Sequence, residues 1–469
     1  MKKTKIICTI GPACETEETL SKMINAGMNV ARVNFSHGDD ESHERVFKLI
    51  KKVREQQNSP IGIMLDTKGP EYRIKTFENG KIFLKQGDEF AFTTKDIIGN
   101  QKIVAVSYKN LIKELKVGDT ILLNNGLLIF KVKKLEKATA VCEVLAGGEL
   151  SNNKSMNFPN KTLKQKYLSE QDKNDLLLGI KNGIDFVACS FVSSAKDVQD
   201  VRIFLNKNGG QNIEIIAKIE NQMGYDNALE ILQECNGLMV ARGDLGVEIA
   251  QEKLPAMQKS LIKDCLGTGK IVITATEMLE SMISNPRPTR AETSDVANAI
   301  YDGSTAIMLS GETAAGKYPV KAVETMSKIA EETEKNINYA ARLSKAEIHE
   351  NSNLDAVSIA CCRLARDTKA KALVACSKTG RTIKQVSRFH SACDVLGLVT
   401  EKEQYYKLSL YFGVKPILVK DFKTLNALFD NAKALAEKEF DLSKGDNIII
   451  TGGTASMTNT NLLKIEQID

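Results

Sequence analysis

Ile215-Ile-Ala-Lys218-Ile-Glu220-Asn221 is an apolar run that ends in charged residues, and Gly237-Leu-Met-Val-Ala-Arg242-Gly-Asp244 is a second one. Parallel α/β folds place their chemistry where such buried strands end. Glu220 and Asp244 are therefore expected at one mouth, where two carboxylates suit a divalent cation such as Mg²⁺. Lys218 beside them suits a negatively charged substrate. Either carboxylate alone is also explained by capping of the following helix, but the two together with Lys218 favour a site.

The composition is that of a soluble, multidomain chain. Its 469 residues exceed one ordinary core and predict roughly three domains. Hydrophobic residues make up 42% and charged residues 26%, and no apolar stretch approaches the roughly 18 residues that span a bilayer. The N-terminal Met1-Lys2-Lys3-Thr4-Lys5 leads directly into a predicted strand, without the apolar run of a signal peptide. We therefore expect a cytoplasmic protein with no membrane partner.

The charge and cysteine patterns exclude further classes of function. The net charge of +5 is mild for this length, and the chain lacks long Lys/Arg runs, so nucleic-acid binding is not predicted. The 10 cysteines form no CxxC pair and no metal-ligand spacing. Reduced thiols are the expected state.

Apolar runs alternate with helical patterns through most of the chain, which predicts α/β structure. The strands of one such series are expected at residues 5–10, 29–34, 62–66, 185–190, 214–219, 237–241, 271–275 and 306–309. Residues 1–69 and 158–340 together have about the length, roughly 250 residues, of a closed (βα)₈ TIM barrel. We predict that these two segments form a TIM-barrel catalytic domain.

The pattern changes between the third and fourth of these strands. There the runs become short and alternating, and the turn Asn124-Asn125-Gly126 is a strong hairpin signal. Residues 70–157 are therefore predicted to form an inserted small β-barrel domain over the catalytic face, here called the lid module. Strands expected at 372–376, 395–399, 416–419 and 447–451 predict an open, mostly parallel sheet. Residues 341–469 are thus expected to be a C-terminal α/β regulatory domain.

Seven motifs follow one another along the chain, six of them at predicted strand ends. They are Asn34-Phe-Ser-His-Gly38, Asp66-Thr-Lys-Gly-Pro-Glu71, Lys218-Ile-Glu-Asn221, Ala241-Arg-Gly-Asp-Leu-Gly246, Thr276-Glu-Met-Leu-Glu-Ser-Met282, Arg287-Pro-Thr-Arg-Ala-Glu292 and Leu309-Ser-Gly-Glu-Thr313. With these motifs in this order, the chain closely resembles the pyruvate kinases, of the bacterial type, from residue 3 to about residue 330. The resemblance implies transfer of the phosphoryl group of phosphoenolpyruvate to ADP, giving pyruvate and ATP in glycolysis.

The resemblance implies roles that suit these residue types. Phosphoryl transfer depends on positioning and on neutralising charge that spreads over the phosphoryl oxygens. By resemblance, Lys218 and Arg32 contact the phosphoryl group, and Glu220 and Asp244 hold Mg²⁺ or Mn²⁺. The backbone at Gly243 and Asp244 would bind the substrate carboxylate.

Thr276 would lie near the enolate, where a proton must arrive; the group that delivers it is left open by the sequence.

The same resemblance implies a potassium site and a nucleotide site. The potassium ligands would be the oxygen-bearing residues Asn34, Ser36, Asp66 and Thr67, and Glu71 matches potassium-dependent members. The nucleotide would meet Asn34, Phe35, Ser36, His37, Arg73 and Lys154. In the absence of the resemblance, His37 would be interpreted as a cap or a surface residue.

The C-terminal third carries one further candidate site. A predicted strand runs into Ser377-Lys378-Thr379-Gly380-Arg381-Thr382, whose hydroxyls and backbone N–H groups could form an anion nest. An ordinary strand-to-helix turn explains the loop equally well. In pyruvate kinases the matching loop binds a phosphorylated effector, so allosteric activation is implied, as is a homotetramer. The stretch Thr451-Gly-Gly-Thr-Ala-Ser-Met457 departs from the family pattern.

Two other departures lie nearer the catalytic motifs. Glu277 stands where the family has Gln, and Gln165-Lys166 replaces Leu-Pro after the lid module. Neither removes a catalytic group. Two other functions stay open at this point: a metal-dependent 2-oxoacid aldolase or lyase on the same barrel, and a non-catalytic metabolite sensor. The lyase leaves the lid module unexplained, and the sensor leaves Lys218, Glu220, Asp244 and Thr276 unexplained.

Overall fold

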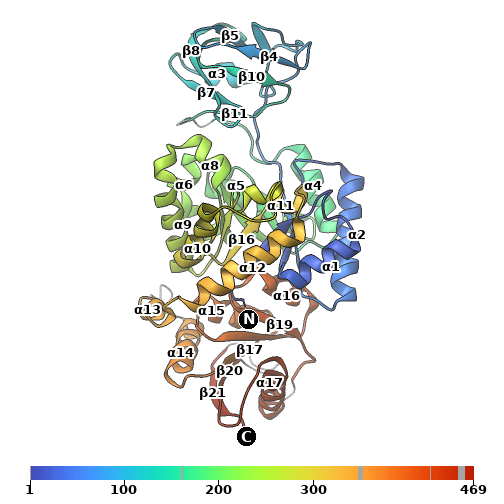
Figure 1. The fold of residues 1–469 in the computed structure, drawn as a ribbon, viewed down its shortest axis with the longest axis vertical. Helices are drawn as coiled ribbons and strands as arrows, with labels where there is room; N and C mark the ends of the chain where they lie inside the picture. Colours follow the sequence, from blue (N-terminus) through green and yellow to red (C-terminus); the bar gives the residue numbers. More distant parts are fainter. Residues whose placement is uncertain (1, 160, 162, 347–351, 423, 453–459) are drawn as a thin grey trace.

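The chain forms three parts that follow one another along the long axis of the molecule (Figure 1). A computed structural model describes residues 2–159, 161, 163–346, 352–422, 424–452 and 460–469. A closed barrel lies in the middle, with the lid module at one end and a C-terminal α/β part at the other (Figure 1). The lid module and the C-terminal part therefore face opposite ends of the barrel.

The barrel is closed by eight parallel strands in the order β1-β16-β15-β14-β13-β12-β3-β2. These strands are β1 (Lys5–Thr9), β2 (Val30–Asn34), β3 (Gly62–Asp66), β12 (Phe186–Cys189), β13 (Glu214–Ile219), β14 (Gly237–Ala241), β15 (Ile271–Ala275) and β16 (Ala306–Leu309). Almost every strand residue is buried, as expected for strands covered on both faces. The predicted TIM barrel is confirmed.

Helices surround the barrel. They are α1 (Glu17–Ala26), α2 (Asp40–Gln56), α4 (Glu170–Lys181), α5 (Ala195–Lys207), α6 (Gln222–Asp226), α7 (Ala228–Glu234), α8 (Arg242–Glu248), α9 (Leu254–Thr268), α10 (Arg290–Asp302), α11 (Gly311–Ala314) and α12 (Pro319–Lys335), with short 3₁₀ turns η1 (Gln251–Lys253) and η2 (Glu280–Ile283). Local sequence sets their ends. Helix α10, for example, begins at a capping box of Thr289 and Glu292 and ends at Gly303, whose φ is 113°.

The lid module is all β apart from one helical turn. Its elements are β4 (Lys81–Leu84), β5 (Glu89–Thr93), β6 (Ile103–Ala105), α3 (Leu111–Glu114), β7 (Thr120–Leu123), β8 (Leu128–Leu135), β9 (Thr139–Ala146), β10 (Gly148–Ser151) and β11 (Met156–Asn157). They form a six-stranded and a two-stranded sheet around one apolar cluster that includes Phe90, Phe92 and Phe130. The predicted hairpin at Asn124-Asn125-Gly126 is confirmed, because all three residues have positive φ between β7 and β8.

The C-terminal part is an open five-stranded sheet in the order β19-β18-β17-β20-β21. Its elements are α13 (Tyr339–Ser344), α14 (Asn353–Asp367), β17 (Ala372–Cys376), α15 (Arg381–Ser387), β18 (Asp394–Val399), α16 (Lys402–Lys407), η3 (Leu408–Leu410), β19 (Val414–Leu418), α17 (Leu425–Glu439), β20 (Asn447–Gly452) and β21 (Leu462–Gln467). Strand β21 pairs antiparallel with β20, whereas the other pairings are parallel.

One apolar cluster joins the barrel to the C-terminal part. It contains barrel residues such as Ile7 and Phe186 together with Tyr406 and Leu408. The C-terminal part therefore packs against the end of the barrel opposite the lid module (Figure 1). Within the described residues, no helix has the length and apolar character that would let it cross a membrane.

Candidate active site

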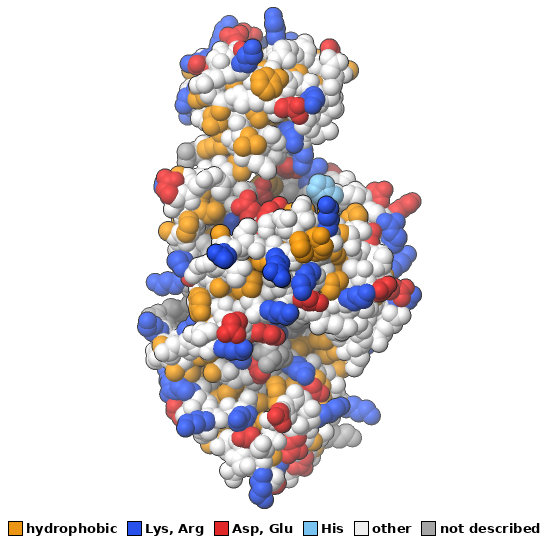
Figure 2. Space-filling model, in the orientation of Figure 1, with side chains coloured by type: hydrophobic (Ala, Val, Ile, Leu, Met, Phe, Trp, Pro, Cys, Tyr) orange, Lys and Arg blue, Asp and Glu red, His pale blue; other side chains and the backbone are white. Residues whose placement is uncertain are grey.

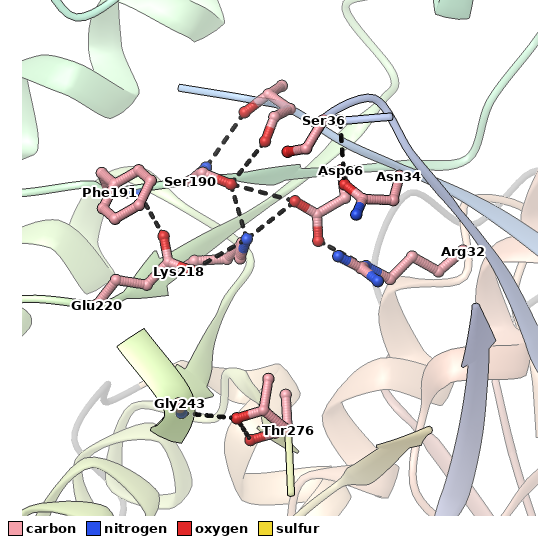
Figure 3. A network of polar contacts seen from close by, with 12 residues as sticks. Arg32, Asn34, Ser36, Asp66, Ser190, Phe191, Lys218, Glu220, Gly243 and Thr276 are labelled. Atoms are coloured by element: carbon pink, nitrogen blue, oxygen red, sulfur yellow. Dashed lines mark hydrogen bonds and ion pairs between the residues drawn. The ribbon is translucent and has the colours of Figure 1, made fainter. Parts of the chain in front are cut away.

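Lys218 lies at the carboxyl end of β13, and only 8% of the residue is exposed. Its ammonium group donates to Asp66 Oδ1 at 3.0 Å and to Ser190 Oγ at 2.7 Å, and it lies 3.0 Å from Glu220 Oε1. These partners come from β3, the end of β12 and the end of β13, so neighbouring strand ends converge on one cation (Figure 3). The ends of three neighbouring strands thus meet at Lys218, where a parallel barrel usually carries its chemistry.

Asp66 links this lysine to a second cation. Its other carboxylate oxygen accepts a hydrogen bond of 2.7 Å from Arg32 Nε. Burial alone would raise the pKa of Asp66, but Arg32 and Lys218 outweigh burial and hold that pKa below its usual value. Burial likewise would lower the pKa of Lys218, but Asp66 and Glu220 outweigh it and raise that pKa. Lys218 therefore stays protonated, which suits stabilisation of an anion.

Glu220 has the surroundings of a carboxylate that needs a cation. It is 1% exposed, and its Oε2 accepts a hydrogen bond of 2.6 Å from the backbone N–H of Phe191. Burial raises the pKa of Glu220; Lys218 opposes this rise, and the charge of Asp244 adds to it. A divalent cation between Glu220 and the exposed Asp244 would offset both unfavourable effects. The two residues therefore fit Mg²⁺ or Mn²⁺.

The remaining ligands of such an ion would come from outside the chain. Among the residues that the structure describes, no cluster of three or more His, Cys, Asp or Glu side chains is placed to hold a metal. Mg²⁺ is commonly bound by one or two carboxylates together with substrate oxygens and water. A site with two carboxylates is consistent with that pattern.

Thr276 lies opposite this cluster, just beyond the end of β15 (Figure 3). Its hydroxyl oxygen accepts a hydrogen bond of 2.8 Å from the backbone N–H of Gly243 and donates one of 2.6 Å to the carbonyl of Ala275. The N–H that was expected to meet a substrate carboxylate therefore donates to Thr276 in this structure. Gly243, in the first turn of α8, and Thr276, in the loop after β15, are therefore in direct contact just beyond two neighbouring strands.

The oxygen ligands expected for potassium also lie close together. Asn34 ends β2, and its side-chain oxygen accepts from the backbone N–H of Ser36 at 3.2 Å. Asn34, Ser36 and Asp66 lie on the same side of the network (Figure 3). Thr67 is buried, and its hydroxyl accepts from the backbone N–H of Ser190 at 3.2 Å. The set consists only of oxygen donors, which suits a hard monovalent cation.

Ser190 is a residue of this network that the sequence motifs did not indicate. Its hydroxyl contacts Lys218, Asp66 Oδ1 at 3.1 Å and the carbonyl of Thr67 at 2.6 Å. The hydroxyl has only one proton to donate, so it accepts from Lys218 and donates to one of the other two. Its position at the end of a barrel strand was the signal that could have identified it.

The residues expected at the nucleotide fall into two groups. Phe35 is 7% exposed and its ring stacks on His43 with centroids 3.8 Å apart, so it supports the loop from behind. His37 is exposed, and its backbone carbonyl accepts from the His43 ring at 2.8 Å. The side chain of His37 is therefore on the surface, while the ring of His43 holds its backbone carbonyl.

Arg73 and Lys154 lie on the two segments that connect the lid module to the barrel. Arg73 pairs with Ser155 in an isolated antiparallel bridge, and the carbonyl of Lys154 accepts from Ile74 N–H at 3.0 Å. Arg73 also forms an ion pair of 2.7 Å with Glu71. The two cations are therefore neighbours at the hinge, and Glu71 partly neutralises one of them.

A cavity of about 510 Å³ lies between the lid module and the barrel. Residues from both sides line it, including Glu71, Tyr72, Asn157, Phe191, Asp244 and Glu248. Figure 2 shows acidic side chains gathered where the lid module meets the barrel. The cavity adjoins Asp244 and the loop that holds Glu220, so it opens onto the candidate metal ligands.

The two departures from the family pattern lie at the edge of the site. The side chain of Glu277 is exposed, while its backbone is part of the loop after β15. Gln165 lines the cavity, and its side-chain oxygen is buried without a hydrogen-bond partner in the described part of the chain. Lys166 is exposed. Neither position contacts Lys218 directly.

The candidate effector loop joins β17 to α15. Gly380 has φ 76° at the start of α15, and Thr382 is 4% exposed with its hydroxyl 2.5 Å from that of Thr460. Lys378, Thr379 and Arg381 are exposed, and Ser377 is half-buried. The divergent stretch that begins at Thr451 lies partly outside the described residues, because 453–459 are not among them. The loop therefore presents two cations and one hydroxyl to solvent.

Fold and site together define a class: a (βα)₈-barrel enzyme with a lid, whose carboxyl-end residues are suited to an anionic substrate and a divalent cation. The family model "Pyruvate kinase, barrel domain" matches residues 1–323, and "Pyruvate kinase, alpha/beta domain" matches residues 355–466. The chain belongs to the pyruvate kinase family.

Individual relatives agree with this assignment. The chain is 44% identical to a pyruvate kinase of Clostridium perfringens, with all of both chains covered. It is 45% identical to one of Staphylococcus aureus, over all of this chain and 81% of that protein. A crystal structure of a pyruvate kinase from Cryptosporidium parvum superposes with a TM-score of 0.95 at 38% identity, covering 99% of this chain and 96% of that one.

Proposed function

We propose that this chain transfers the phosphoryl group of phosphoenolpyruvate to ADP, giving pyruvate and ATP in glycolysis, at the mouth of the barrel. The observation that carries the proposal is the buried ammonium of Lys218, held by Asp66, Ser190 and Glu220 in a chain of the pyruvate kinase family. We also propose a cytoplasmic location, because the proposed substrates are those of glycolysis. No finding favours the lyase or the sensor.

Lys218 and Arg32 would act on the phosphoryl group. Both are buried, both contact Asp66, and both point into the same network (Figure 3). Cations fixed in advance at a dry site stabilise developing negative charge without rearranging during the reaction. The planar guanidinium of Arg32 suits phosphate oxygens, and Lys218 acts as a point charge on the group in transfer.

Glu220 and Asp244 would hold Mg²⁺ or Mn²⁺, and Asn34, Ser36, Asp66 and Thr67 would hold K⁺. A bound divalent ion supplies positive charge that neutralises substrate and phosphate oxygens. Lys218 positions Glu220 through their contact of 3.0 Å, and the N–H of Phe191 holds its other oxygen. Glu71 supports dependence on potassium. Turnover should therefore fall when choline replaces K⁺ in a buffer that is free of Na⁺, at constant ionic strength.

Thr276, Gly243 and Asp244 would surround the carboxylate and enolate of the substrate. The hydrogen bond between Gly243 N–H and Thr276 Oγ1 supports this placement, because it brings the first turn of α8 and the loop after β15 together at one point of the mouth. The proton that completes pyruvate would arrive on the side that Thr276 lines.

The lid module would close over the nucleotide. Arg73 and Lys154 lie where the module joins the barrel. Asn34 ends β2 and is followed by Ser36 and His37, with Phe35 packed beneath. Closure would remove water from the phosphates, which strengthens every charge interaction there. We also propose the domain limits 1–69 with 158–340, 70–157 and 341–469. The separate sheets of these three parts support the limits: the closed barrel, the two sheets of the lid module and the five-stranded sheet of the C-terminal part.

Residues 377–382 would bind the phosphate of an effector, and the assembly would be a homotetramer, as the family resemblance implies. The exposed Lys378 and Arg381 support an anion at the loop. Fructose 1,6-bisphosphate, ribose 5-phosphate and AMP should each be titrated against the phosphoenolpyruvate saturation curve. No response to any of them would refute the effector, and a monomeric mass in solution would refute the tetramer.

The decisive experiment measures ATP formation from phosphoenolpyruvate and ADP with Mg²⁺, with and without K⁺. We expect robust turnover in the wild type and loss of activity in Lys218→Met. Lys270→Met is the matched control, because Lys270 precedes β15 at the other end of the barrel and donates to the carbonyl of Cys235. Equal activity in Lys218→Met and Lys270→Met, or no turnover in the wild type, would refute the proposed function.

A further inference from the structure

The loop after β15 contains two consecutive residues in the left-handed backbone conformation. Thr276 has φ 68° and Glu277 has φ 54°. Residues with a side chain rarely adopt this conformation, and it persists only where the surroundings hold it. The strain is located at the residue that the proposed function places beside the enolate. The contacts that hold this pair are therefore part of the active-site geometry.

Arg242 makes those contacts. Its Nη2 donates to the carbonyl of Thr276 at 2.7 Å and to the carbonyl of Glu277 at 3.1 Å, and its Nε donates to the Thr276 carbonyl at 3.2 Å. One planar guanidinium thus binds the carbonyls of both strained residues. A lysine cannot reproduce this arrangement, because its ammonium lacks the fixed fork of donors.

The guanidinium is itself fixed from the opposite side. Asp295 of α10 accepts from Nη1 at 2.8 Å, and only 7% of Arg242 is exposed. Gln258 of α9 lies 3.5 Å from the same nitrogen. Arg242 therefore bridges the helices outside the barrel and the loop at its mouth, and it has little freedom to move.

The next residue of the chain completes the contact. Gly243 directly follows Arg242 and donates its N–H to the Thr276 hydroxyl (Figure 3). The first turn of α8 therefore holds Thr276 twice, at its carbonyl through the side chain of Arg242 and at its hydroxyl through the backbone of Gly243. Farther along the loop, Glu312 accepts from Leu279 N–H at 3.0 Å and so holds a different point.

We propose that Arg242 is a positioning residue for the proton-delivery step, because it holds the backbone of Thr276 and Glu277 in the conformation that keeps Thr276 at the side of the mouth where the enolate would lie. The inference rests on the proposed function. After the phosphoryl group has left, the C2=C3 electron pair of the enolate forms a new C3–H bond and the C2–O bond becomes the carbonyl of pyruvate. The proton comes from the side that Thr276 lines and is replaced from solvent. Phosphoryl transfer itself, at Lys218, does not involve Arg242.

The test compares Arg242→Lys with Asp295→Asn and with the wild type. Two rates are measured: ATP formation from phosphoenolpyruvate and ADP, and exchange of the pyruvate methyl protons for deuterium in D₂O, followed by proton NMR with Mg²⁺, K⁺ and ATP. Arg202→Lys is the matched control. Arg202 also donates to two backbone carbonyls, those of Gln211 and Ile213, but in the segment between α5 and β13, away from the mouth.

We expect Arg242→Lys to lower both methyl-proton exchange and kcat, by roughly 10- to 100-fold, because a small displacement of a reacting group has effects of this size. KM for phosphoenolpyruvate should change less than about twofold, because a positioning role changes kcat rather than uniform binding. The solvent isotope effect on kcat should rise as proton transfer becomes slower. Asp295→Asn should have a smaller effect in the same direction, and Arg202→Lys should match the wild type.

The inference would be overturned if folded Arg242→Lys had the wild-type rate of methyl-proton exchange and the wild-type kcat. A variant in which only KM changed would overturn it as well. If Arg242→Lys does not fold, Asp295→Asn decides, since it leaves the carbonyl contacts in place and loosens only their anchor. Wild-type protein that forms no ATP would refute the proposed function and this inference with it. Wild-type turnover together with unchanged exchange in the variants would overturn the inference alone.

Discussion

Glu214, the first residue of β13, forms an ion pair with Lys384 of α15. Glu214 is 4% exposed, and its second oxygen accepts a hydrogen bond of 2.9 Å from the Tyr411 hydroxyl. The pair spans the contact between the barrel and the C-terminal part. Lys218 lies near the carboxyl end of β13, and the last two residues of the candidate effector loop, Arg381 and Thr382, begin α15. One ion pair therefore joins the strand of the candidate catalytic lysine to the helix in which that loop ends.

We expect Glu214→Gln to weaken the contact between barrel and C-terminal part, because it leaves the Lys384 ammonium without its partner at a largely buried site. Breaking a buried pair typically costs about 3–5 kcal/mol. Hydrogen exchange of the amides in β13 should speed up, and any effector response should shrink, while Lys218 and its partners stay in place.

Glu324→Gln is the control, because Glu324 pairs with Lys321 on the exposed surface of α12. A double-mutant cycle of Glu214→Gln and Lys384→Met should give a clear coupling energy in denaturant unfolding. Additive effects of the two substitutions would contradict a direct link.

Ser190→Ala should lower kcat by roughly 10-fold or more, because a hydrogen bond to a charged group is worth about 1.5–3 kcal/mol. The substitution removes the 2.7 Å contact that orients the Lys218 ammonium. Steady-state kinetics provide the measurement. Ser193→Ala is the neighbouring control, since Ser193 accepts from Asn221 rather than from Lys218. Equal kcat values for the two variants would show that Ser190 does not orient Lys218.

We expect Glu248→Ala to raise KM for ADP by roughly 10-fold, because it removes a hydrogen bond to a charged group, which is worth about 1.5–3 kcal/mol. Glu248 is on α8, and its Oε1 accepts from the N–H of Phe158, where the lid module rejoins the barrel, at 3.3 Å. Burial raises the pKa of Glu248. Glu248→Gln keeps an acceptor and should stay near the wild type. An unchanged KM in Glu248→Ala would mean that this contact does not hold the lid module.

Asp185 should make stability depend on pH. It precedes β12, accepts from Ile63 N–H at 2.8 Å and lies 3.4 Å from Arg54. Burial raises its pKa to about 6, although Arg54 opposes the rise. In the unfolded chain the value is about 3.9. The folded state therefore binds the proton more tightly, so this contribution to stability is present below about pH 4 and is lost as the pH rises through about 6.

We expect Asp185→Asn to remove this loss of stability with rising pH, which is on the order of 2–3 kcal/mol between pH 4 and pH 7. The measurement is the difference in urea midpoint between variant and wild type at several pH values. The difference should grow in favour of the variant as the pH rises. Asp441→Asn, at an exposed position, should show a constant difference. A constant difference for Asp185→Asn as well would contradict the raised pKa.

The sequence alone determined the barrel, because its strands are buried apolar runs and most of them are followed by charged or polar residues. The strands at Gly62–Asp66, Glu214–Ile219 and Ile271–Ala275 have the predicted limits, since burial on both faces leaves a continuous pattern. Strand β21 was not predicted, because an edge strand is half exposed and its sequence, Leu462–Gln467, mixes charged with apolar residues.

Only the tertiary structure decided which strand ends meet and what each side chain faces. It brought Ser190 to Lys218, turned Phe35 into the core and placed Arg242 under Thr276. These relations depend on contacts between residues far apart in the chain, such as Arg242 and Thr276, which no local pattern encodes. Local propensity and burial set the elements, whereas barrel closure sets the distances between their ends, and the candidate chemistry depends on those distances.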